Sequence, residues 1–426
     1  MSAPVVANHN TRRTQFFVCL GKSEKPLGKL IFVKDGQREF SQFAYNESWL
    51  TDTQYFDVSP DLQRQTGYQL RKPPNKNNSC FFLALADTEP DAWGRRVIAR
   101  AHAKARAKNA HLGPLTEVDF LACVDDVSRV GALRLRDDKG NYLRSASDGE
   151  RSTPALLALE KILLASRAVE LGQETAEDLA YLQGKGTSLG GMRPKCTLVD
   201  ADGSLALGKF PSVNDERAVT RGEVLALRLA AMAGIDSAQA RTVMVQNQPV
   251  AVIRRFDRTP EDHRIPYISA ATLLQANRDD EHSYTEILDV MRSSCENFVK
   301  DARQLWRRLV FNHLITNVDD HLQNMGFLYS GHNQWRLSPA FDLNPFPDKD
   351  PESKTWLSED SGPVASIEQL LSHAFRFELT PPQAQSVLDE VVSAVKRWRE
   401  VAVMPEVGMQ AQEMTDFKPA FERHAI

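Results

Sequence analysis

The chain reads Asn317-Val318-Asp319-Asp320-His321-Leu322-Gln323-Asn324 and, a short hairpin later, Ser338-Pro339-Ala340-Phe341-Asp342-Leu343. The first stretch sets an amide five residues after an acid, and the second adds another acid. Transfer of a phosphoryl group from ATP-Mg needs a carboxylate that orients a hydroxyl nucleophile, and an Asn and an Asp that hold the metal. The order and spacing therefore favour the catalytic loop and metal loop of a protein-kinase-like enzyme.

Asp319 is the predicted catalytic residue. The apolar spacing over 298–315 predicts a helix that ends just before it, so Asp319 lies on a loop. A carboxylate there is placed to accept a hydroxyl proton, and Asn324 and Asp342 carry the oxygen ligands that Mg²⁺ prefers. Taken singly, the three residues are ordinary surface or turn residues. Their joint spacing favours function.

A metal-dependent hydrolase is a rival interpretation of the same region, with His313, Asp319, Asp320 and His321 as ligands. Adjacent Asp320 and His321 are awkwardly spaced for one ion, and the H-E-x-x-H pattern of zinc hydrolases is absent from the sequence. We therefore rank this alternative below the kinase.

Length and composition set the broad class. A chain of 426 residues exceeds what one hydrophobic core normally serves. The net charge of -4 requires any nucleic-acid contact to come from a local patch. Five scattered cysteines without a C-x-x-C pair indicate a reducing compartment. No signal peptide or long apolar run is visible, so we expect a cytoplasmic protein without membrane contact.

The chain divides into three predicted parts: a β-rich N-terminal module at 1–150, a kinase N-lobe at 151–258 and a C-lobe at 259–426. Asp35-Gly36 predicts a hairpin in the first part. The second part reads as a glycine loop, a hairpin over 195–210 and a helix over 223–233. Beyond 257 the periodicity is mostly helical. The predicted fold is α+β and bilobal, with an all-helical C-terminal lobe.

Lys209 lies at the end of a predicted strand, where a charge needs a partner. Nucleotide phosphates would supply one, as for the strand lysine of kinases, although an edge-strand lysine is equally ordinary. Glu223 on the following helix is a candidate to position Lys209, or simply a first-turn acid. The glycine loop at 184–195 matches no standard phosphate-loop pattern, but Arg193 and Lys195 beside it suit phosphate oxygens.

Two further features have open interpretations. At 255–257, after a strand, Phe256 is placed to stack on a purine and Asp257 to bond ribose hydroxyls, or the pair is a core Phe beside a surface acid. The predicted helix at 91–110 carries a basic face that suits nucleic-acid phosphates or solvent. That face comprises Arg96, Arg100, Lys104 and Lys108.

Together these motifs resemble the HipA family, the serine/threonine-kinase toxins of bacterial HipBA toxin–antitoxin systems. The resemblance covers roughly 15–400 and is carried by 186–195, Gly208-Lys209-Phe210, 255–258, 317–324 and 339–343. It implies a protein serine/threonine kinase that uses ATP and Mg²⁺, with Asp319 as catalytic base and Asn324 and Asp342 as metal ligands. The implied nucleotide-binding set is Ser188, Gly190, Gly191, Lys195, Lys209, Arg255, Phe256, Asp257, His321, Asn324 and Asp342.

The resemblance also implies partners and regulation. Ser188 falls where the family autophosphorylates in its phosphate loop, and added charge there would disturb a phosphate cradle. The best-known family substrate is glutamyl-tRNA synthetase, so a cytoplasmic protein such as an aminoacyl-tRNA synthetase is the expected target, with growth arrest as the result. The usual partner is HipB, a helix-turn-helix antitoxin that binds operator DNA with the toxin. A catalytically weak corepressor subunit is the alternative. Met192 and Arg193-Pro194 depart from the family prototype's loop.

Overall fold

The structure is a computed structural model that describes residues 11–144, 156–185 and 191–423. Within these ranges, no helix is both long enough and apolar enough to cross a lipid bilayer. Four sheets organise the described chain, and each of the two larger sheets lies wholly within one predicted part. The predicted domain boundaries themselves remain predictions.

A five-stranded antiparallel sheet forms the first part, in the order β4-β3-β2-β1-β5. The predicted Asp35-Gly36 turn joins β2 to β3, and Gly36 has the left-handed φ of 61° that glycine adopts without strain. The strands are β1 Thr11–Leu20, β2 Lys25–Asp35, β3 Arg38–Tyr45, β4 Gln69–Arg71 and β5 Leu133–Arg136, with helices α1 Glu47–Leu50, α2 Leu83–Ala86, α3 Ala92–Lys108 and α4 Glu117–Ala122.

The second part is a four-stranded antiparallel sheet in the order β6-β7-β9-β8. The predicted hairpin is confirmed, with Gly203 in the left-handed turn between β6 and β7. The predicted helix begins four residues earlier than expected and is followed by Gly234 at φ 73°. The elements are η1 Leu156–Ala158, α5 Leu159–Leu171, α6 Ala176–Lys185, β6 Lys195–Val199, β7 Leu205–Lys209, α7 Val219–Met232, β8 Ala240–Val245 and β9 Gln248–Arg254.

The C-terminal part is mainly helical, but the prediction that it is all-helical is wrong. It contains a three-stranded sheet, β10-β11-β12, and a small two-stranded pair, β13-β14. The hairpin between the two predicted loops is β11-β12, which turns through His332 and Asn333, both at left-handed φ. The strands are β10 Tyr267–Ser269, β11 Gly326–Gly331, β12 Gln334–Leu337, β13 Trp356–Ser358 and β14 Gly362–Pro363.

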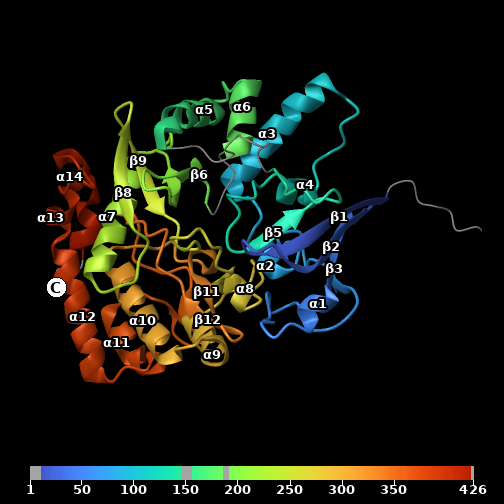
Figure 1. Ribbon diagram of the computed structural model, residues 1–426. Coiled ribbons are helices and arrows are strands. Elements are labelled where there is room, and N and C mark those ends of the chain that lie inside the picture. Colours follow the sequence, from blue (N-terminus) through green and yellow to red (C-terminus); the bar gives the residue numbers. More distant parts are fainter. Residues whose placement is uncertain (1–10, 145–155, 186–190, 424–426) are drawn as a thin grey trace, which may run out of the picture.

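Helices surround these strands and extend back to the second part. The helices are α8 Ala270–Leu273, α9 Tyr284–Ser294, α10 Phe298–Leu314, η2 Leu322–Asn324, α11 Ile367–His373, η3 Ala374–Phe377, α12 Pro381–Lys396, α13 Trp398–Ala402 and α14 Ala411–Glu422. Both α12 and α13 pack against α7. Figure 1 shows α12–α14 on the side of the molecule opposite to the β1–β3 strands, so the sheet of the second part lies between them.

Two hydrophobic cores hold the elements together. The larger core runs from the first sheet through α7 to the C-terminal helices. The second core lies under the β6-β7-β9-β8 sheet, and it includes Trp93 and Val97 from α3. Helix α3 precedes residue 150, yet it buries its apolar face in the second part. The first part is therefore attached to the second through a shared core.

Candidate functional site

Three predicted site residues meet in one buried cluster. The Lys209 ammonium lies 2.6 Å from a carboxylate oxygen of Glu223 and 2.7 Å from Oδ1 of Asp342. Lys209 comes from the end of β7, Glu223 from α7 and Asp342 from the loop after β12. The side chains of Lys209 and Glu223 are almost fully buried, and that of Asp342 is 19% exposed. The expected pairing of Glu223 with Lys209 is present.

Contacts far along the chain fix α7 beside Lys209. A Cβ at Gly222 would stand 2.6 Å from the ring of Phe417 in α14, so only glycine lets the two helices approach this closely. Arg221 also forms an ion pair of 2.6 Å with Glu413 of α14. These contacts flank Glu223 on its own helix. The position of its carboxylate therefore depends on α14.

The loop that carries Asp342 is held in an unusual conformation. Asp342 has φ 55°, the left-handed region that aspartate tolerates at some cost. The preceding Ala340 exchanges backbone hydrogen bonds with the 236–238 segment, at 2.7 and 2.9 Å. The Asn344 side chain donates to Asp342 Oδ1 at 2.9 Å. The backbone thus directs the Asp342 carboxylate at Lys209.

The electrostatics of the cluster follow from burial and pairing. Burial would lower the pKa of Lys209, but Asp342 and then Glu223 raise it above its ordinary value. Burial would raise the pKa of Asp342, yet Lys209 and Lys195 hold it below its usual range. Burial raises the pKa of Glu223, and Lys209 opposes that rise. Lys209 and Asp342 are therefore a charged pair at neutral pH.

Asp319 lies on the loop after α10, as predicted, and is partly open to solvent. Asn324 Nδ2 donates to the Asp319 backbone carbonyl at 2.8 Å, which ties the amide to the loop. The Lys354 ammonium forms an ion pair with the Asp319 carboxylate, and His321 Nε2 is 3.9 Å from the same oxygen. The side chains of Asp319 and Lys354 are 35% and 58% exposed, so both are accessible from solvent.

Neighbouring Asp320 has a different environment, because it is buried and anchors the loop. It accepts hydrogen bonds from the Tyr284 hydroxyl at 2.6 Å and from the Lys354 backbone N–H at 2.7 Å. Thr355 Oγ1 donates to its backbone carbonyl. Burial raises the pKa of Asp320. Asp320 thus fixes the 354–355 segment and brings Lys354 to Asp319.

A small cavity, partly open to solvent, joins the two predicted loops. Its lining includes Asn317, Asp320, His321, Asn324, Phe341 and Asp342. Within the described ranges, the hydrogen bonds leave Asn324 Oδ1 and Asp342 Oδ2 without a protein donor. Two hard oxygen atoms on a shared cavity wall suit Mg²⁺. The residues present therefore fit the metal that the sequence implies.

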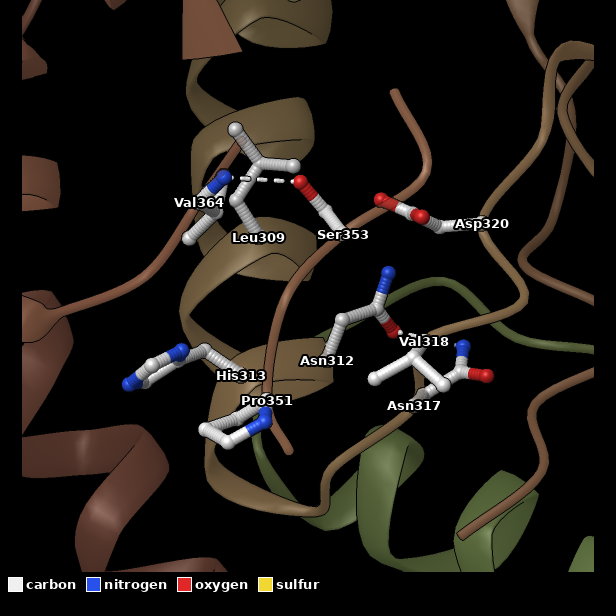
Figure 2. Close-up of a pocket in the computed structure, with 9 residues that line it drawn as sticks. All are labelled: Leu309, Asn312, His313, Asn317, Val318, Asp320, Pro351, Ser353 and Val364. Carbon is white, nitrogen blue, oxygen red and sulfur yellow. Dashed lines mark hydrogen bonds between the residues drawn. The ribbon is translucent and has the colours of Figure 1, made fainter. Parts of the chain in front are cut away.

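A second small cavity lies between α10 and the 351–364 segment and bears on the hydrolase alternative (Figure 2). Figure 2 shows the His313 ring directed away from Asp320. Among the residues described, no group of three or more His, Cys, Asp or Glu side chains is placed to hold a metal ion. The four residues of the hydrolase hypothesis do not form one ligand set.

The predicted nucleotide contacts at 255–257 have another environment. Arg255 donates to both Asp257 oxygens, at 2.9 and 2.6 Å, and Asp257 also accepts from the Gly131 N–H and from Arg258 at 2.7 Å each. Asp257 is 3% exposed. Its carboxylate is thus fully engaged with the protein, and the expected bond to ribose is not supported. Phe256 is half-buried, 5.4 Å from the Phe341 ring.

The end of the glycine loop is held by α3. Lys195 Nζ lies 3.0 Å from Asp91 Oδ2, and both side chains are buried. Gly191, at φ 98°, would place a Cβ 2.6 Å from that ammonium. Arg193 pairs with Asp215. The predicted Ser188 and Gly190 lie outside the described residues.

Comparison with known proteins connects this arrangement to one family. Residues 187–399, half of the chain, match the model of the HipA-like C-terminal domain. This range contains Lys209, Glu223, both predicted loops and the α12 helix behind α7. The chain belongs to the HipA-like C-terminal domain family.

Relatives of the HipA-like chain extend beyond that range. It is 26% identical over 343 residues to the provisionally named kinase Y4mE of Sinorhizobium fredii (strain NBRC 101917 / NGR234), covering 74% of this chain and 75% of the relative. It is 28% identical over 337 residues to the provisionally named kinase Y4dM of the same organism, covering 75% and 74%. The match therefore includes sequence outside the C-terminal domain.

A solved structure shows the same fold over almost the whole length. A chain in the Shewanella oneidensis MR-1 complex of toxin–antitoxin proteins HipA and HipB with operator DNA superposes with a TM-score of 0.65, at 14% identity and 96% coverage of each chain. At this identity the similarity concerns the fold alone. The mixed α/β fold predicted from the sequence is thereby confirmed.

The basic face of α3 in this HipA-like chain is engaged within the molecule. Arg100 pairs with Glu174 at 2.9 Å, and Lys104 contacts the same residue. Arg96 donates to carbonyl oxygens at the end of α5, where basic side chains satisfy unpaired carbonyls. Three of the four basic residues thus hold α5 and α6 to α3. They give no support to a nucleic-acid interface.

Sequence reasoning missed two residues beside the predicted site, Asp91 and Lys354. Asp91 precedes a periodic helix and reads as an N-cap, which it is, since Oδ1 accepts the Gly94 N–H at 2.7 Å. Nothing local indicates its second partner, Lys195. Lys354 lies in a polar stretch without periodicity. Only the contact of that stretch with Asp320 brings it to Asp319.

Proposed function

We propose that this chain is an ATP- and Mg²⁺-dependent serine/threonine protein kinase of the HipA type. The observation that carries the proposal is the buried contact of Lys209 with Glu223 and Asp342 beside a cavity that Asn324 and His321 also line. A lysine placed by a helix glutamate, next to an acid on a metal loop, is the set of parts that phosphoryl transfer requires. The provisional kinase names of the relatives support the same conclusion.

Each residue then has one role. Lys209 binds the nucleotide phosphates and Glu223 orients it. Asn324 and Asp342 hold Mg²⁺, which neutralises phosphate charge when bound. Asp319 orients the substrate hydroxyl and takes its proton as the oxygen attacks the γ-phosphorus and the bond to the ADP oxygen breaks. At the end of the proposed phosphate loop, Lys195 and Gly191 bind the nucleotide phosphates.

The partners follow from the family and the solved relative. Because that structure holds HipA with HipB and operator DNA, we include in the proposal a HipB-like helix-turn-helix antitoxin that binds this chain and brings it to operator DNA. The substrate is a cytoplasmic protein whose phosphorylation arrests growth. An aminoacyl-tRNA synthetase such as glutamyl-tRNA synthetase is the first to assay.

Autophosphorylation tests the catalytic part of the proposal. Purified chain incubated with Mg²⁺ and γ-labelled ATP should incorporate label on Ser or Thr, with Ser188 as the first position to inspect by mass spectrometry. Asp319→Ala should abolish incorporation, because the base is lost. Asp360→Ala removes an exposed acid outside the two predicted loops and should label like wild type. Full labelling of Asp319→Ala would overturn the proposal.

The alternative is a weakly catalytic corepressor subunit. Its support from the sequence was the basic face of α3, which the structure engages in contacts with the α5–α6 region. It predicts tighter operator binding by the antitoxin and no growth arrest when the chain is expressed alone. Phosphoproteomics after induced expression, wild type against Asp319→Ala, separates the two and identifies the substrate.

A further inference from the structure

Two lysines face each other across the β6-β7 pair, close to the predicted metal loop. Lys195 is the cross-strand partner of Lys209 in the antiparallel register. Both side chains are buried, Lys195 being 2% exposed and Lys209 7%. Directly opposed like charges destabilise a sheet, and buried ammonium groups need counter-charges. Each lysine therefore requires its own acid or an anionic ligand.

The two lysines obtain their acids from different parts of the chain. Lys209 has Glu223 and Asp342. Lys195 has Asp91, at 3.0 Å, from the N-terminal side of the molecule. Lys195 is paired in register with Lys209, whose ammonium contacts Asp342 of the metal loop at 2.7 Å. Both ammonium groups thus act on the place where the phosphates are proposed to bind.

The Asp91 carboxylate is held in place by contacts other than its ion pair with Lys195. Its Oδ1 accepts the Gly94 N–H at 2.7 Å as the N-cap of α3, which leaves Oδ2 directed at Lys195. Two residues on, Trp93 is buried in the second core, and its backbone N–H donates to the Gly191 carbonyl at 3.3 Å. The first turn of α3 therefore fixes both the lysine and the loop backbone beside it.

We propose that Asp91 is a positioning residue for nucleotide binding: it holds the Lys195 ammonium toward the phosphates and couples the N-terminal part of the chain to the end of the glycine loop. This role rests on the proposed kinase function. It assigns to α3, outside the matched family domain, a direct influence on affinity for a nucleoside triphosphate. Because the effect passes through Lys195, it concerns the phosphates and leaves the nucleoside unaffected.

The test compares ligands with and without phosphates. Asp91→Asn keeps the size of the side chain and its capping oxygen but removes the charge. Binding of a non-hydrolysable ATP analogue and of adenosine is measured by calorimetry on the full chain. We expect the analogue to bind about tenfold more weakly, as for loss of a charge-assisted contact, and adenosine to bind unchanged. Asp91→Ser repeats the test if Asp91→Asn does not fold.

Two further variants make the result specific. In a Lys195→Met background, Asp91→Asn should have no additional effect on analogue binding, because the residue it positions is gone. Glu174→Gln removes another acid that pairs with α3, through Arg100, and should leave both affinities unchanged.

The outcomes separate the two proposals. If wild type binds neither ligand, the kinase function itself is wrong. If wild type binds the analogue and Asp91→Asn binds it equally well, or loses adenosine in parallel, the positioning role of Asp91 is wrong. An undiminished effect of Asp91→Asn in the Lys195→Met background would also overturn it.

Discussion

Two buried charge clusters in this molecule invite comparison, because sequence reasoning assigned both to the nucleotide. One contains Lys209, Glu223 and Asp342, and the other contains Arg255, Asp257 and Arg258. In the second cluster the arginines also donate to backbone carbonyls of 127–131, at 2.8 to 3.2 Å. Both Asp257 oxygens accept from protein donors. Every charge there has a partner within the chain.

The first cluster differs because one of its carboxylate oxygens has no hydrogen-bond donor among the described residues. Two acids surround one lysine, and Asp342 borders a cavity. Within the described residues its Oδ2 has no protein donor. The contrast teaches that a buried charge is a better sign of a ligand site when its hydrogen bonds are incomplete than when it is merely buried.

Lys209→Met tests the first cluster, in which Asp342 borders the cavity, and should have the largest effect. It removes the phosphate-binding charge, so we expect kcat/KM for phosphoryl transfer to fall about a thousandfold or more, the loss typical of a preorganised charge donor. Steady-state kinetics with Mg-ATP measure it. Lys161→Met, on the exposed surface of α5, is the matched control and should behave like wild type. Activity within tenfold of wild type would remove the proposed distinction between the clusters.

Asp257→Asn tests the second cluster, in which every charge has a partner within the chain, and should lower the stability of the fold. It leaves Arg255 and Arg258 buried without their carboxylate, so the free energy of unfolding should fall by about 3 kcal/mol. Denaturant titration measures the loss. The fraction that remains folded should bind ATP with normal affinity. If the Asp257→Asn protein were stable but failed to bind nucleotide, that result would support the predicted contact between Asp257 and ribose.

The pH dependence of stability should distinguish Lys209→Met from wild type. In wild type the pKa of Asp342 is lowered, so its charge contributes stability above about pH 4, the unfolded value, and that contribution is lost as pH falls. Burial already raises the pKa of Glu223 in wild type, and removing Lys209 removes the largest charge that opposes this rise. The variant should therefore lose more stability than wild type as the pH rises above about 5. Thermal unfolding across that range checks the sign; parallel curves for the two proteins would contradict it.

Lys354→Met tests the exposed ion pair with Asp319, which lies outside both clusters, and should have a moderate effect. The lysine pairs with Asp319 but is 58% exposed, so we expect kcat to fall about tenfold and the melting temperature to stay the same. Lys349→Met, on the same segment, serves as control. A kcat equal to that of wild type would show that Lys354 has no part in transfer.

Arg100→Ala should have the smallest effect and concerns neither cluster. Its pair with Glu174 is partly exposed, so the loss of unfolding free energy should be about 0.5 kcal/mol. Operator binding by the antitoxin complex should not change, as a mobility-shift assay would show. Weaker operator binding would instead indicate that the basic face of α3 contacts nucleic acid.

Local signals predicted much of this architecture. Asp202-Gly203 and the strands beside it specified the hairpin that carries Lys209, and apolar periodicity specified α7 and α10. The spacing of Asp319, Asn324 and Asp342 indicated which loops to consider. These signals succeed because turns and amphipathic helices depend on neighbours in the sequence.

What failed depended on distant partners. The three-residue strand β10 exists because it pairs with β11, far along the chain, so the expected hairpin at 326–337 could not be recognised as part of a three-stranded sheet. Asp257 looked like a surface acid or a ribose ligand because its donor Gly131 belongs to another part of the molecule. The contacts of Asp91 with Lys195 and of Lys354 with Asp319 could not be predicted for the same reason.

The contacts between α14 and α7 also have a consequence during protein synthesis. The Arg221–Glu413 pair spans 192 positions of the chain, and Thr316, just before Asp319, donates to the Ala420 carbonyl at 3.3 Å. A nascent chain therefore contains Lys209, Glu223, Asp319 and Asp342 before α14 is available to add its contacts with α7. A product whose translation stops ahead of α14 would carry every proposed catalytic residue and still lack their alignment. For the proposed kinase, we therefore expect activity only after nearly all of the described chain has been made.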